Sequence, residues 1–168
     1  MNEIPVRMLS ESIITLLTEA YPGPPEHTAT WFIDNEPDSG ILGILRDVTA
    51  EEASKSVDGT GNAGTTIASH AEHLHWSLAN MNRAMSGGEF GKWSESWNLK
   101  EANAAEWDRL RTELRKEYEL LCVGLRDQAE IDPRYLTGGL ALAAHAAYHL
   151  GNIRQMKERV RTQGSMDN

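Results

Sequence analysis

The chain has 168 residues, which is long enough for one domain with a hydrophobic core of its own. Its 16 basic and 25 acidic side chains give a net charge of −9, which argues against a nucleic-acid-binding surface because phosphate binding needs clustered cations. Cys122 is the only cysteine, which excludes an internal disulfide framework and a cysteine-rich zinc site. Apolar runs stay well short of the ~20 residues of a membrane-spanning helix, and the first residues lack a secretion signal. We therefore expect a soluble cytoplasmic protein with a single domain over residues 1–168.

Apolar residues recur at spacings of three and four along the first part of the chain, the spacing of an amphipathic helix. This pattern predicts a helix over residues 5–20, which the proline-rich stretch 21–25 ends. The following loop holds His27, expected at the surface, and Trp31-Phe32-Ile33, which could be read as a strand. A short helix is expected over 41–48.

Three more long helices are expected in the rest of the chain. The second follows a glycine-rich run, takes Thr65 or Thr66 as its N-cap, and ends at Gly87-Gly88. The third is predicted over residues 99–125, and the fourth after Asp132-Pro133 and Gly138-Gly139 up to about residue 161.

Four amphipathic helices with almost no strand signal predict an all-α four-helix bundle. The linker between the second and third helices is about a dozen residues, longer than a simple helical hairpin needs. It permits a crossover, so the topology could be up-down-down-up.

The sharpest candidate site is the pair His145 and His149, four residues apart on the fourth helix. Side chains at this spacing share one face, from which two imidazoles can bind one metal ion. Both fall on the apolar face of that helix, where an unpaired polar group costs a few kcal/mol. They are read either as metal ligands or as ordinary core histidines.

The second helix carries three further histidines. His70 lies nearest the centre of the apolar stripe on an ideal helical wheel, ahead of His73, while His75 lies on the other flank. Periodicity alone therefore favours His70 as a third ligand.

Two segments resemble the DinB-like (YfiT-like) metalloprotein superfamily. They are TIASHAEHL at 66–74 and HAAYHLGNIRQ at 145–155, and the tryptophan-bearing stretch 93–107 also fits. The resemblance covers most of the chain and implies an up-down-down-up four-helix bundle. It also implies a divalent metal, zinc or nickel above all, held by one histidine of the second helix and a His-x-x-x-His pair of the fourth.

Carried onto this chain, the resemblance implies the ligands His73, His145 and His149. It selects His73, because the family's ligand in this helix directly precedes a leucine. The helical wheel favours His70 instead, so His70 remains the alternative ligand. Two further groups are left with two interpretations, as site residues or as packing and surface residues: Trp76, Trp93, Trp97 and Trp107, and Tyr148, Asn152, Arg154 and Gln155.

Three nitrogen ligands leave a coordination position open, as in catalytic rather than structural sites. The superfamily includes thiol-dependent S-transferases and a thiol-dependent isomerase. We therefore expect a metal-dependent enzyme on a small molecule, of the thiol S-transferase or hydrolase type, without nucleic-acid or membrane partners. The alternative is a non-catalytic bundle with structural histidines that acts through self-association, and a homodimer is compatible with both.

Neutral imidazole is the form that binds a metal ion, so protons compete with the ion. From the free imidazole pKa near 6.5, the sequence predicts that metal affinity falls as the pH drops from 8 to 5.

Overall fold

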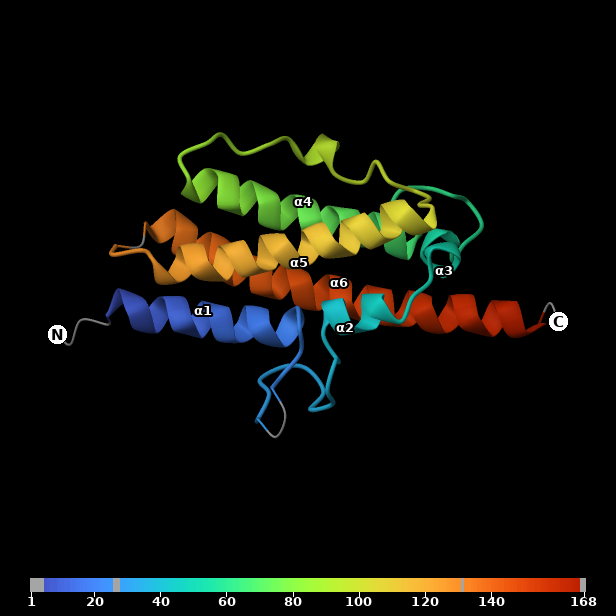
Figure 1. Ribbon diagram of the computed structural model, residues 1–168, viewed down its shortest axis with the longest axis horizontal. Helices are drawn as coiled ribbons and strands as arrows, with labels where there is room; N and C mark the ends of the chain where they lie inside the picture. Colours follow the sequence, from blue (N-terminus) through green and yellow to red (C-terminus); the bar gives the residue numbers. More distant parts are fainter. Residues whose placement is uncertain (1–4, 26–27, 131, 167–168) are drawn as a thin grey trace.

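The structure, a computed structural model, describes residues 5–25, 28–130 and 132–166. All regular secondary structure in these residues is helical, which confirms the all-α prediction (Figure 1). The elements are α1 (Val6–Ala20), α2 (Ile41–Arg46), α3 (Ala50–Ser54), α4 (Ile67–Met85), the 3-10 turn η1 (Trp93–Glu95), α5 (Ala104–Arg126) and α6 (Pro133–Met166).

The four long helices pack side by side. α4 contacts α5 and α6, and α1 contacts the same two helices. Figure 1 shows α1 and α6 running in one direction along the long axis of the molecule, and α4 and α5 running in the other. The core between them holds fully buried leucine and isoleucine side chains from each helix, among them Leu17, Leu74, Leu114 and Ile153.

The linker between α4 and α5 returns along α4, so that α5 starts at the same end of the molecule as α4 (Figure 1). Two hydrogen bonds hold it there. The Gly91 N–H donates to the Asn80 side chain at 2.6 Å, and the Leu99 N–H donates to the Glu72 carboxylate at 2.7 Å. The residues between these two points consequently lie over the middle of α4.

Two predicted helix starts were wrong. α5 begins five residues later than expected, because Asn103 and Glu106 form a capping box that fixes its first turn. α6 begins at Pro133, so Gly138 and Gly139 lie inside the helix rather than before it.

These glycines permit close helix packing. A Cβ atom on Gly139 would lie 3.0 Å from Cγ2 of Ile13 in α1, and one on Gly138 would lie 3.1 Å from Cε of Met81 in α4. α6 therefore approaches α1 and α4 more closely here than a larger residue would allow.

The possible strand at residues 31–33 was also wrong, because this segment forms bends. The backbone N–H groups of Trp31 and Phe32 donate to the buried carboxylate of Glu19, which ties the loop to α1 in place of a strand partner. Helix α3 was not anticipated, although Thr49 and Glu52 form a capping box at its start. His27 lies outside the described residues.

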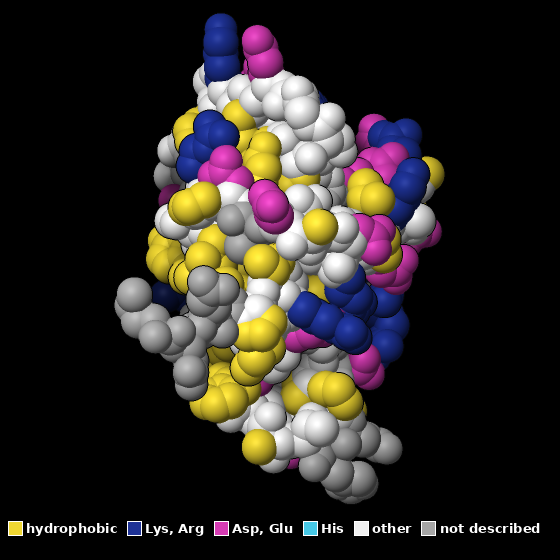
Figure 2. Space-filling model, turned by 90° about the vertical axis from the view of Figure 1, so that its left-hand side faces the viewer, with side chains coloured by type: hydrophobic (Ala, Val, Ile, Leu, Met, Phe, Trp, Pro, Cys, Tyr) yellow, Lys and Arg dark blue, Asp and Glu magenta, His cyan; other side chains and the backbone are white. Residues whose placement is uncertain are grey.

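Figure 2 shows the end of the molecule where α4 and α5 finish and α6 begins. Apolar side chains there form patches between acidic and basic groups, and no histidine is visible on this face. Within the described part of the chain, none of the helices is both long and apolar enough to cross a membrane.

Candidate metal centre

α4 and α6 bring three histidines together. His73 comes from the middle of α4, and His145 and His149 come from successive turns of α6. The start of α4 is fixed by Thr66, whose hydroxyl accepts the Ser69 N–H, so the helix begins two turns before His73. His73 and His149 are buried, and His145 is half-buried.

The Nε2 atoms of these rings converge on one point. Nε2 of His145 lies 2.9 Å from Nε2 of His73 and 2.9 Å from Nε2 of His149. All three nitrogens lie within 4.8 Å of one another. Nitrogens bound to one tetrahedral zinc ion are about 3.3 Å apart, given Zn–N bonds of 2.0–2.1 Å. The three rings are therefore close to the spacing of a metal-binding cluster.

His70 lies outside this cluster and contacts the outer nitrogen of His149. Its Nδ1 lies 2.8 Å from Nδ1 of His149, and its Nε2 lies 3.0 Å from the carbonyl oxygen of Gly64. A carbonyl oxygen only accepts, so Nε2 of His70 donates and Nδ1 accepts from His149. The proton of His149 then lies on Nδ1, and its Nε2 presents a lone pair to the cluster.

A second hydrogen-bond chain fixes the ring of His73. The Ser96 hydroxyl donates to the carbonyl oxygen of Trp93 at 2.9 Å and lies 2.9 Å from Nδ1 of His73. The hydroxyl can donate to only one of these two atoms, and with its proton on the Trp93 carbonyl it accepts from Nδ1 of His73. His73 also presents its Nε2 lone pair to the cluster.

These two hydrogen-bond chains determine which nitrogens of the cluster carry a hydrogen. Lone pairs of His73 and His149 both face Nε2 of His145, which carries at most one hydrogen. A hydrogen on Nε2 of His145 can donate to only one of these two lone pairs. The other lone pair then faces a nitrogen that has no hydrogen to donate to it. A cation at the centre satisfies all three nitrogens, with His145 in the tautomer that bears its proton on Nδ1.

Burial keeps the imidazoles uncharged at neutral pH. Burial, followed by the charge of neighbouring His145, lowers the pKa of His73 to about 4. The same causes, with smaller contributions from His70 and His73, lower the pKa of His149 to about 3. Burial also lowers the pKa of His145 and that of His70, where the hydrogen bond to Gly64 opposes it. Neutral imidazole is the form that a metal ion needs.

Trp97 covers the cluster. Its ring stacks on His73 at a centroid distance of 4.1 Å and meets the edge of His70 at 5.2 Å. Trp97 has a backbone φ of 76°, a conformation that non-glycine residues seldom adopt. The linker thus brings both Ser96 and Trp97 against the histidines.

Three other candidates lie away from the cluster, whereas Trp76 and Trp93 contact the ring of His73 and Tyr148 contacts that of His149. His75 is half-buried and outside the three-histidine group. Trp107 is in the core, with its indole N–H donating to the Val48 carbonyl. Arg154 pairs with Asp34 and the Ser39 carbonyl, fastening the loop after α1 to α6.

Sequence reasoning missed Ser96 and Gly64, which hold the outer nitrogens of the histidine network. Neither belongs to a motif, because Gly64 acts through its backbone and Ser96 through its position on the linker. The available signal was the presence of both His70 and His73 on α4. The two residues were interpreted as alternatives for one ligand position.

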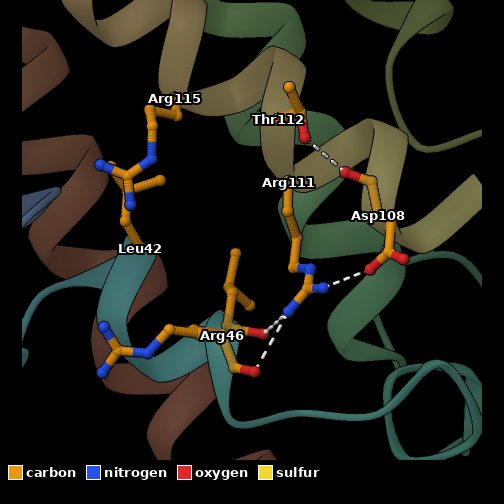
Figure 3. A pocket seen from close by; sticks show the side chains of 7 residues that line it. Leu42, Arg46, Asp108, Arg111, Thr112 and Arg115 are labelled. Carbon is orange, nitrogen blue, oxygen red and sulfur yellow. Dashed lines mark hydrogen bonds and ion pairs between the residues drawn. The ribbon is translucent and has the colours of Figure 1, made fainter.

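A separate cavity of about 350 Å³ lies between α2 and α5 (Figure 3). Arg46 and Arg111 line it, but their guanidinium groups are already paired. Arg46 binds Asp38 at 2.7 Å, and Arg111 binds Asp108 and the carbonyl oxygens of Leu45 and Arg46. The bonds from Arg111 to these two carbonyl oxygens fasten α5 to α2, and the cavity shares no residue with the histidine cluster.

No family model, no curated protein and no solved structure matches this chain.

Proposed function

We propose that the protein binds one divalent metal ion through Nε2 of His73, His145 and His149. The observation that carries this proposal is the approach of Nε2 of His73 and Nε2 of His149 to within 2.9 Å of Nε2 of His145. Purely structural histidines are expected to pair donor with acceptor, and these three rings cannot do so at both contacts.

The donor set suits zinc or nickel, because imidazole binds several first-row ions and carboxylates are absent from the group. Three protein ligands leave a position open for water or substrate. A metal ion bound there acidifies a water or thiol, or polarises a carbonyl group.

The residues around the ligands have distinct tasks in this proposal. His70 and Ser96 hold the outer nitrogens of His149 and His73, which keeps both lone pairs directed at the ion. Trp97 shields the His73 side of the centre from water through its stacked ring.

We further propose that the protein is a metal-dependent enzyme on a small molecule, of the thiol S-transferase or hydrolase type. The resemblance to the DinB-like superfamily supports this, as does the open coordination position. The opposed directions of α1 and α6 against α4 and α5 are consistent with an up-down-down-up bundle. Homodimers are compatible with this function.

Metal content measured on protein purified without a metal column tests the proposal. We expect about one zinc, nickel or other divalent ion per chain. A chain that stays metal-free after incubation with each of these ions would favour the alternative, a non-catalytic bundle acting through self-association.

Melting temperatures of a His145→Leu/His149→Leu variant separate ligands from core histidines. Leucine fills a similar volume without a polar atom, so the variant without metal should be as stable as wild-type apoprotein or more so. A metal at a hundredfold excess over its dissociation constant should stabilise the wild type by ~2.7 kcal/mol and leave the variant unchanged. An equal response in both proteins would exclude these histidines as ligands.

A further inference from the structure

An apolar cavity of about 250 Å³ adjoins the histidine cluster. His145 belongs to both, forming one wall of the cavity while its Nε2 faces His73 and His149. The other lining residues are Ser77, Met81, Phe90, Trp93, Gly138, Ala141 and Leu142.

The cavity continues the two helix faces that carry the histidines. On α4, Ser77 and Met81 follow His73 at intervals of four residues, so they lie one and two turns further along the same face. On α6, Leu142 and Gly138 precede His145 by about one and two turns. The cavity therefore lies next to the histidine cluster along both helix faces, and the two share His145.

The walls of the cavity offer almost no polar partner. None of the eight lining residues is an Asp, Glu, Lys or Arg, His145 is the one titratable group among them, and the Ser77 hydroxyl already donates to the His73 carbonyl at 2.8 Å. A charged group entering the cavity would lose its hydration without compensation. An uncharged apolar group would gain from leaving water.

Aromatic groups and a thioether form much of the wall. Phe90 and Trp93 of the linker lie 6.4 Å apart between ring centroids, and Trp76 supports both, at 5.7 and 5.0 Å. Phe90 and Trp93 remain 51% and 60% exposed, so their rings stand at the mouth rather than filling the space. Met81 faces them from α4, and methionine sulfur packs favourably on aromatic rings.

The size of the cavity fits one ring with a short chain. An apolar cavity of about 150 Å³ holds a benzene ring, and this cavity is larger at about 250 Å³. We propose that it binds the uncharged aromatic part of a small molecule whose metal-binding head occupies the open position beside His145. Such a molecule is the substrate class for the function proposed above. Its binding through the metal ion rests on that proposed function.

The first experiment tests the cavity without a metal. Toluene is titrated into chelator-treated protein, and the Met81 methyl signal, assigned with a Met81→Leu variant, is followed by NMR. We expect a saturable shift of this signal from the ring current of the bound toluene.

Two glycine variants provide the comparison. Gly138→Leu inserts a side chain toward Met81, since its Cβ would lie 3.1 Å from the Met81 Cε, and should abolish the shift. Gly151→Leu makes the same exchange on α6 where no atom lies within 4 Å, and should retain it. Trp93→Ala removes one wall at an exposed position and should weaken toluene binding even if Gly138→Leu fails to fold. A shift that persists unchanged in both Gly138→Leu and Trp93→Ala, or no shift in wild type, would overturn the inference.

The second experiment uses cobalt-loaded protein, whose thiolate absorption band reports ligand binding. It compares 2-phenylethanethiol with 2-mercaptoethanesulfonate, which share a two-carbon thiol and differ in an aromatic or anionic end. We expect the phenyl compound to bind at least about tenfold more tightly, and this preference to fall to near parity in Gly138→Leu but not in Gly151→Leu.

The two experiments fail separately. A protein that binds no cobalt but shows the saturable toluene shift would overturn the proposed metal function and support the apolar site. A protein that binds cobalt but prefers the sulfonate would overturn the aromatic substrate class and leave the metal centre supported.

Discussion

Two backbone carbonyls determine how the histidines can be used. Gly64 fixes the proton of His70, which in turn fixes that of His149, while Trp93 acts on His73 through Ser96. Imidazole can carry its proton on either nitrogen, so these outer contacts decide which nitrogen is free to bind a metal. Which nitrogens could bind a metal ion is therefore a property of the hydrogen-bond network as well as of the histidines.

The different positions of His73 and His70 lead to different expected effects of their removal. His73→Ala removes a nitrogen of the cluster and should reduce bound metal well below one ion per chain. His70→Ala leaves all three cluster nitrogens and removes only a supporting contact, so it should retain one ion with an affinity lowered about 10–100-fold. Metal content and competition with a chromogenic chelator measure both quantities.

His75→Ala is the matched control, because His75 lies on α4 outside the cluster. It should bind metal as the wild type does. Loss of the ion in His70→Ala with retention in His73→Ala would reverse the assignment and return His70 to the ligand position that the helical wheel favours.

At the scale of elements, the site depends on how closely α6 packs against its neighbours. The clustered histidines come from α4 and α6, so the distance between these helices sets the spacing of their nitrogens. Gly138 and Gly139 lie in the first turns of α6 against Met81 and Ile13, and they allow close approach at a helix-propensity cost of about 1 kcal/mol each relative to alanine.

Gly139→Leu tests this packing at a position away from the apolar cavity. Its Cβ would lie 3.0 Å from Cγ2 of the buried Ile13, so the side chain overfills the contact between α6 and α1. We expect it to be less stable than Gly151→Leu by about 1–3 kcal/mol in urea unfolding. The comparison cancels the gain in helix propensity, which the two variants share. Equal stabilities would show that α1 and α6 do not need a glycine at this contact.

At the scale of the whole molecule, the bundle removes the imidazoles from water. Burial is the largest cause of the lowered pKa values of His73 and His149, about 4 and about 3. Protons therefore compete with a metal ion at lower pH than the free imidazole value predicts. The sequence predicts a steep loss of metal affinity between pH 8 and 5. With these lowered pKa values, we expect the loss to occur closer to pH 4.

The same burial makes the stability of the metal-free protein depend on pH. In the unfolded chain the imidazoles have a pKa near 6.5, so between about pH 6.5 and 4 the unfolded state binds more protons than the folded state. The free energy of unfolding should be greatest above pH 6.5 and fall as the pH drops toward 4. Urea unfolding in the presence of chelator, at several pH values over this range, measures the effect.

The His145→Leu/His149→Leu variant separates this contribution from that of the carboxylates. It lacks the buried imidazole of His149 and the half-buried one of His145, so its stability should fall less steeply over the same pH range. Identical pH profiles for the variant and the wild type would show that these histidines do not titrate in the unfolding transition.

The sequence by itself determined the helical class and three of the residues brought together. Spacings of three and four marked the long helices, and Thr65-Thr66 and the proline-rich stretch 21–25 marked ends that local chemistry dictates, with Thr66 the N-cap in the structure. The four-residue spacing of His145 and His149 placed them on one face, because that follows from helix geometry alone. The choice of His73 came from the family resemblance, against periodicity, and the structure groups it with the other two.

Only the tertiary structure decided the contacts that join segments distant in sequence. The direction of His70 depends on the Gly64 carbonyl and on α6, and the role of Ser96 depends on the path of the linker along α4. Gly138 and Gly139 resembled a helix boundary because glycine is a poor helix former, and their place inside α6 follows from packing against α4 and α1. The pKa values likewise depend on burial, which periodicity does not quantify. Local hydrogen bonding and side-chain spacing are encoded along the chain, whereas tautomers, close approaches and desolvation arise only when the helices pack together.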